Sequence, residues 1–165
     1  MIIRVRSLGV EEAAASLNKN VRGKFTQAIR QALRAGQQEG RRLTDARYVR
    51  KINPLGRLRL RASGLHGSLT ISGPRNPINK FRLRPATRPP NNPPGGLYVQ
   101  ILRGGGGQLP HAFIGKGKVL ERTGASRLPI RRLTTVSTPG AWNVFSPQVE
   151  ELLQRHLEKN LEAVL

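Results

Sequence analysis

The chain has 165 residues, no cysteine, and 29 Lys and Arg against 9 Asp and Glu, for a net charge of +20. This length suits one domain with a substantial core, and the lack of cysteine excludes disulfides and thiolate metal sites. No run approaches the roughly 20 apolar residues that cross a membrane as a helix.

The positive charge is concentrated in the middle of the chain. Residues 46–145 contain eighteen Lys and Arg against one acid, Glu121, whereas residues 146–165 have a net charge of −2. Such a field attracts polyanions: nucleic acid, an acidic lipid surface or an acidic protein. Only seven residues are aromatic, which disfavours a surface that stacks single-stranded bases. Duplex phosphate and an acidic protein surface remain the open alternatives.

The N-terminal part predicts a lead-in strand or arm at residues 2–8, followed by a long helix. Apolar residues recur in steps of three and four from Gly9 to about Ala46. Gly36 and Gly40 each cost about 1 kcal/mol in a helix interior. A bend at either glycine and an unbroken helix of roughly 55 Å both remain open. The apolar stripe consists of Val10, Ala14, Leu17, Val21, Phe25, Ala28 and Ala32.

Basic and apolar residues alternate over much of residues 57–84. A period of two places the apolar set on one sheet face and the cationic set on the other. We expect strands at residues 57–62, 65–72 and 79–84, in one antiparallel sheet backed by the terminal helices. The cationic front either contacts a partner or is simply a solvated face. The residues predicted to contact a polyanion or partner are Arg57, Arg59, Arg61, Lys80, Arg82, Arg84, Arg88, Lys116, Lys118, Arg131 and Arg132.

Three later stretches are rich in glycine or proline. Residues 85–96 contain five prolines and two glycines, which predicts a long exposed loop, either a connector or an arm ordered by a partner. Residues 104–107 are four glycines, but they lack the Lys-Ser/Thr of a phosphate-binding loop, so they predict a hairpin tip. Residues 115–118 lie between two apolar runs and predict another hairpin turn.

Catalytic and metal-binding patterns are missing from the sequence. The three histidines are widely separated, and no serine lies in a Gly-x-Ser-x-Gly elbow. The basic region lacks a pair of carboxylates for acid–base chemistry, and Glu121 is expected to form an ion pair with Arg122. We therefore expect a protein that is not an enzyme and needs no metal or cofactor.

The chain closes with a predicted amphipathic helix at residues 146–165. Ser146 is a suitable N-cap, and Pro147 suits the first helical position. The fold class we expect is α+β: a long N-terminal helix, an antiparallel sheet of four to six strands with long Pro/Gly loops, and this C-terminal helix. We divide the single domain into a helical arm (1–46), a basic sheet with its loop 85–96 (47–145) and the C-terminal helix.

Several short motifs in this chain belong together. Residues 109–142 read LPHAFIGKGKVLERTGASRLPIRRLTTVSTPGAW, and a strand with Phe81 precedes the proline-rich loop. This combination resembles the phage minor tail protein Z family, the tail completion proteins of long-tailed phages. The chain departs from the family pattern at a glycine, which is replaced by Thr135 or Val136. The matching positions are Phe81, Ala112, Phe113, Arg122, Leu128, Pro129, Ile130 and Pro139.

The resemblance implies a structural virion protein at the head-proximal end of a long non-contractile tail. There it would complete the tail and support head–tail joining and the passage of DNA. The resemblance also suggests a homo-oligomeric ring, with six copies, that contacts the tail tube, the tail terminator, neck proteins and the packaged DNA end. Assembly would take place in the host cytoplasm. The alternative function is a basic nucleic-acid-binding module of the architectural or ribosome-associated kind.

Overall fold

The structure, a computed structural model, covers most of the chain. The residues it describes are 2–6, 19–50, 57–63, 66–87, 96–124, 126 and 128–163. The predicted helix start at residues 9–18 and most of the predicted loop, residues 88–95, lie outside the described residues.

The described residues form helices and short antiparallel strands. The helices are α2 (Lys19–Arg47), α3 (Thr138–Asn143) and α4 (Ser146–Glu162), with a 3-10 turn η2 (Ile78–Lys80). The strands are β1 (Ile2–Arg6), β2 (Arg57–Ser63), β3 (His66–Ser72), β4 (Arg75–Pro77), β5 (Arg82–Arg84), β6 (Leu97–Leu102), β7 (Gly105–Leu109), β8 (Ala112–Gly115), β9 (Lys118–Arg122), β10 (Ile130–Arg132) and β11 (Thr134–Ser137). Their sheets are β1-β3-β2, β5-β6-β7, β10-β9-β8 and β11-β4.

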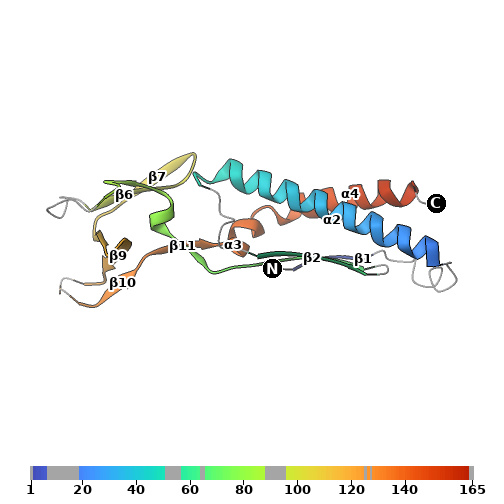
Figure 1. Ribbon diagram of the computed structural model, residues 1–165. Helices are drawn as coiled ribbons and strands as arrows, with labels where there is room; N and C mark the ends of the chain where they lie inside the picture. The colour runs from blue at the N-terminus through green and yellow to red at the C-terminus, as the bar shows by residue number, and fades with distance from the viewer. Residues whose placement is uncertain are drawn as a thin grey trace.

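The α+β class with a long N-terminal helix and a C-terminal helix is confirmed. Figure 1 shows an elongated molecule in which α2 and α4 lie side by side over one face of the β1-β3-β2 sheet. We call this part the helical lobe. The β5-β6-β7 and β10-β9-β8 sheets lie at the opposite end, and we call them the strand lobe. None of the described helices combines the length and the apolar character needed to cross a membrane.

Helix α2 runs without a break through both of its late glycines. A Cβ atom added at Gly36 would lie 2.6 Å from Leu153 Cδ2, and one added at Gly40 would lie 2.1 Å from Trp142 Cζ3. Real Cβ atoms essentially never approach heavy atoms so closely. The two glycines therefore form notches that let α3 and α4 pack against the α2 backbone, and the helix is continuous from Lys19 to Arg47.

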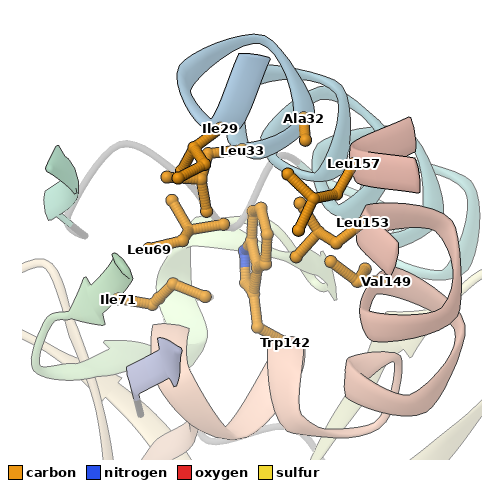
Figure 2. Packing of buried hydrophobic residues seen from close by; sticks show 9 residues of the cluster. All are labelled: Ile29, Ala32, Leu33, Leu69, Ile71, Trp142, Val149, Leu153 and Leu157. Atoms are coloured by element: carbon orange, nitrogen blue, oxygen red, sulfur yellow. The ribbon is translucent and has the colours of Figure 1, made fainter. Parts of the chain in front are cut away.

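The main core lies between the helices and the sheet (Figure 2). Trp142, which is 1% exposed, points its indole ring between side chains of the sheet and of both long helices. Alternate residues of β3 are buried beneath α2, as the period of two predicts. The buried residues of this cluster are Ile29, Ala32, Leu33, Leu69, Ile71, Trp142, Val149, Leu153 and Leu157.

A second core lies in the strand lobe, and backbone hydrogen bonds connect it to the end of α2. The Val49 N–H donates to the Ile101 carbonyl at 2.9 Å, and the Arg103 N–H donates to the Arg47 carbonyl at 2.9 Å. These two bonds fix the C-terminal end of α2 to β6. The buried residues of the second core are Ile78, Leu97, Val99, Ala112 and Val119.

The strands are divided among four small sheets, whereas the sequence led us to expect one. After β3, Pro77 supplies no N–H, and the turn η2 follows, closed by the Phe81 N–H donating to the Ile78 carbonyl at 2.9 Å. The chain has already left the first sheet at β4, which pairs with β11, and η2 then separates β4 from β5. As a result the strand expected at residues 79–84 shortens to Arg82–Arg84, and Lys80 lies in the turn.

The junction before α4 also differs from expectation. The helix begins at Ser146 itself, and the Ser146 hydroxyl donates to the Asn143 carbonyl at 2.9 Å, so it does not cap α4. Phe145 is the N-cap of α4 and makes no side-chain cap hydrogen bond. A serine caps α3 instead, because the Ser137 hydroxyl accepts a hydrogen bond from the Gly140 N–H at 3.1 Å. Helix α3 was not predicted from the sequence.

Substitution of Gly40 by alanine is expected to destabilise the protein by about 2 kcal/mol or more, because the new methyl group would overlap the buried Trp142 ring. Gly23 is the matched control, since it lies in the same helix and a Cβ there would meet nothing within 4 Å. Gly23→Ala should stabilise by about 0.5–1 kcal/mol through helix propensity. Urea unfolding of both variants measures the difference, and a neutral Gly40→Ala would contradict the notch.

Candidate interaction surfaces

The predicted cationic front forms on β2, in the helical lobe. Arg59 and Arg61 are exposed. The residues that alternate with them, Leu60 and Ala62, are partly buried against the core. Arg57 lies on the same strand, at a register position opposite Ser72. In Figure 1 the helices cover the other side of this sheet only. The alternation of β2 therefore separates a core face from an open face, as predicted.

Strand β1 adds two arginines to this sheet that our sequence prediction did not include. The register aligns Arg4 with Ser68, and Ser68 in turn with Arg61. It also aligns Arg6 with His66. The alternation of isoleucine or valine with arginine in residues 2–6 was the signal that could have found them.

A second basic group lies at the β8–β9 hairpin. Lys116 and Gly117 have φ values of 50° and 68°, the left-handed conformation typical of a two-residue hairpin turn. The Asn79 side-chain amide donates to the Gly117 carbonyl at 2.7 Å. This bond places the turn next to η2, and so brings Lys80 near Lys116 and Lys118. All three lysines are exposed.

The third basic group is on β5, in a different sheet from β2. Arg82 and Arg84 are exposed, and Leu83 between them is half-buried. An Arg82 guanidinium N–H donates to the Gln100 side-chain oxygen at 3.4 Å on the neighbouring strand. The expected continuous cationic face is therefore two separate faces, one in each lobe.

Two of the basic side chains in the β10-β9-β8 sheet already contact other side chains of this protein. Arg131 pairs with Glu121 across the sheet, with Nη2 to Oε2 at 2.6 Å. The expected partner Arg122 instead lies over the Phe113 ring, 5.5 Å from its centroid. Neighbours along a strand point to opposite faces, so Glu121 is closer to the cross-strand residue. Arg132 is exposed, and Arg88 lies outside the described residues.

The motif residues divide between core and surface. Phe81 and Ala112 are buried, Phe113 is half-buried under Arg122, and Pro139 lies in the first turn of α3. Leu128 and Ile130, by contrast, are 68% and 39% exposed on or beside the edge strand β10. An edge strand with exposed apolar side chains is a typical site of contact with another chain.

An open apolar pocket of about 440 Å³ lies in the strand lobe, where β6, β7 and β11 meet the residues after α2. Tyr48, Ile101 and Val136 line it together with the backbone of residues 105–107. Burial raises the pKa of the Tyr48 hydroxyl above its usual value, and the nearby charge of Arg47 opposes the shift. The phenol therefore stays neutral at physiological pH. Within the described ranges, no group of three or more His, Cys, Asp or Glu side chains could bind a metal ion.

The raised pKa of Tyr48 predicts a stability difference at alkaline pH. The unfolded phenol ionises near pH 10, whereas the folded phenol resists ionisation, so folding stability is lost as the pH rises above about 10. Tyr48→Phe removes this contribution. The free energy of unfolding of the wild type, relative to the variant, should fall between about pH 9 and about pH 11. A difference that stays constant over this range in urea titrations would contradict the assignment.

Comparison with known proteins found no similar protein. No protein-family model, no curated protein and no solved structure matches this chain.

Proposed function

We propose that this protein is a structural component of a phage tail, located at its head-proximal end. There it completes the tail and supports head–tail joining and DNA passage. The observation that carries the proposal is the exposure of Leu128 and Ile130, two residues of the motif on which the family resemblance rests. A motif needed only for packing would be buried. An exposed apolar motif on an edge strand supports a role in contact between chains.

In this proposal the protein works as a ring around the tail channel. Its two lobes differ chemically: one has helices over a sheet with an arginine-bearing open face, and the other has short strands with exposed apolar edges. Contact between unlike surfaces of successive copies closes into a ring when the rotation is right. Other surfaces would meet the tail tube, the tail terminator and neck proteins. The mature protein would reside in the virion after assembly in the host cytoplasm.

The proposed role is contact rather than catalysis, without a cofactor. The charge of Glu121, the sole acid of residues 46–145, is matched by Arg131 in a cross-strand ion pair. The basic surfaces would instead meet DNA phosphate or acidic neighbours.

Negative-stain imaging of the purified chain tests the assembly directly. Rings are the expected result for the chain alone, and decoration of tail ends is expected when the chain is mixed with tails. Deletion of the gene should leave tails of normal appearance but abolish infectious particles. Monomers that bind DNA without forming rings would favour the alternative of a nucleic-acid-binding module. Loss of tail-tube polymerisation on deletion would contradict a completion role.

Replacing the exposed motif side chains by polar ones is expected to abolish ring formation. The double variant Leu128→Ser, Ile130→Thr keeps strand propensity at position 130 and removes exposed apolar surface, so its unfolding free energy should change by less than about 1 kcal/mol. Val144→Ser is the control, because Val144 is also an exposed apolar residue, at 50%, but lies between α3 and α4. Sedimentation and imaging should show rings for the control only. Intact rings in the double variant would exclude this edge as the interface.

A further inference from the structure

We infer that the open face of the β1-β3-β2 sheet is a binding surface for duplex nucleic acid, contacted through its phosphates. The inference deepens the proposed function and rests on it, because it selects which basic surface meets DNA and what the ligand is.

The geometry of this face suits a regular row of phosphates. Arg59 and Arg61 are exposed on the side of the sheet away from the helices, and in the described chain neither has a carboxylate partner. Residues two apart on an antiparallel strand are about 6.8 Å apart, so successive guanidinium groups can each reach a different phosphate of one DNA strand. The register places Thr70 opposite Arg59 and Ser68 opposite Arg61. Guanidinium and hydroxyl groups both donate hydrogen bonds to phosphate oxygens.

The charge on this sheet is of a single sign. The sequences of its three strands, IIRVR, RLRLRAS and HGSLTIS, contain five arginines and no acid. Among the described residues, the acids lie on α2, on β9 and on α4. A face that is only solvated typically mixes both signs, which limits self-repulsion. A single-sign face instead creates a field that attracts a polyanion.

The same strands favour duplex over other polyanions. None of them contains Phe, Tyr or Trp, so the face lacks the aromatic platforms on which single-stranded bases stack. The arginines of β2 are regularly spaced, because they occupy every second position of the strand. The carboxylates of an acidic protein surface have no such regular spacing. A duplex backbone matches this spacing without any sequence readout.

The other basic groups are less suited to this ligand. Arg82 is hydrogen-bonded to Gln100, and β5 has three residues, too short for a longer row. Arg131 is neutralised by Glu121. The β5 arginines are nevertheless exposed and spaced two apart, like Arg59 and Arg61, which makes them a matched comparison in charge and spacing.

Fluorescence anisotropy with short duplexes of two unrelated sequences tests the inference. The wild type should bind both sequences equally, with affinity that falls steeply as salt rises. In the double variant Arg59→Gln, Arg61→Gln, the affinity for duplex at about 0.1 M salt should drop roughly tenfold or more. The magnitude of the slope of log K against log[salt] should fall by about 2. The control Arg82→Gln, Arg84→Gln has the same net charge and should lose less than about threefold. Arg59→Lys, Arg61→Lys should retain the wild-type salt slope.

Three results would overturn the inference. Equal losses in the two glutamine variants would mean that the total charge, not this face, determines binding. Displacement of a labelled duplex by polyglutamate as efficiently as by unlabelled duplex would identify an acidic protein as the ligand class. Urea unfolding should give the same midpoint for all variants, because the substituted side chains are exposed. Imaging for rings keeps the two proposals distinguishable: rings without DNA binding would sink this inference alone, and DNA binding without rings would sink the proposed function.

Discussion

The contact between Trp142 and the backbone of α2 at Gly40 determines how the rest of the molecule is placed. The indole ring fills the space that a side chain at position 40 would occupy, so α3 lies directly against the long helix. Strand β11 immediately precedes α3 and pairs with β4, which leads through η2 into the strand lobe. Asn76 of β4 strengthens this connection, because its side-chain amide donates to the Val136 carbonyl at 2.8 Å. This close approach therefore acts together with the backbone hydrogen bonds between the end of α2 and the end of β6 to position both lobes.

The one-sided arrangement of helices has a direct chemical result. Because α2 and α4 both pack on the same face of the β1-β3-β2 sheet, they cover the apolar side chains of β2 and β3 that reach the core, and Arg59 and Arg61 stay accessible. The core side chains of these two strands are Leu60, Ala62, Leu69 and Ile71. In the strand lobe, the small sheets enclose a separate core and leave other apolar residues at an edge. The protein therefore presents basic faces in both lobes and an exposed apolar edge in the strand lobe.

Features that depend on local periodicity could be predicted from the sequence. The stripe of buried residues in α2 and α4 and the alternation in β2 and β3 follow the spacing of apolar residues. Strand partners could not be predicted, because pairing brings together residues far apart in the chain. This is why Arg59 and Arg82 looked like parts of one face although they belong to different sheets. Helix α3 was missed because its six residues, TPGAWN, contain Pro and Gly and no period.

The prediction for Glu121 failed for a reason that the sequence itself contained. The sequence predicts a hairpin turn at residues 115–118, so Glu121 and Arg122 follow on the strand after it, where adjacent residues point in opposite directions. Arg122 was therefore on the wrong side, and only a cross-strand residue could pair with Glu121. The partner, Arg131, comes from β10, whose register with β9 is a tertiary feature.

The helical lobe and the strand lobe lie at opposite ends of the molecule, and this gives the molecule a physical direction (Figure 1). The C-terminal end of α4 lies at the extremity of the molecule farthest from the strand lobe (Figure 1). A dense label fused there would mark one end of the molecule without touching the strand lobe. Its radial position in an averaged image would then report which end faces the central axis of an assembly.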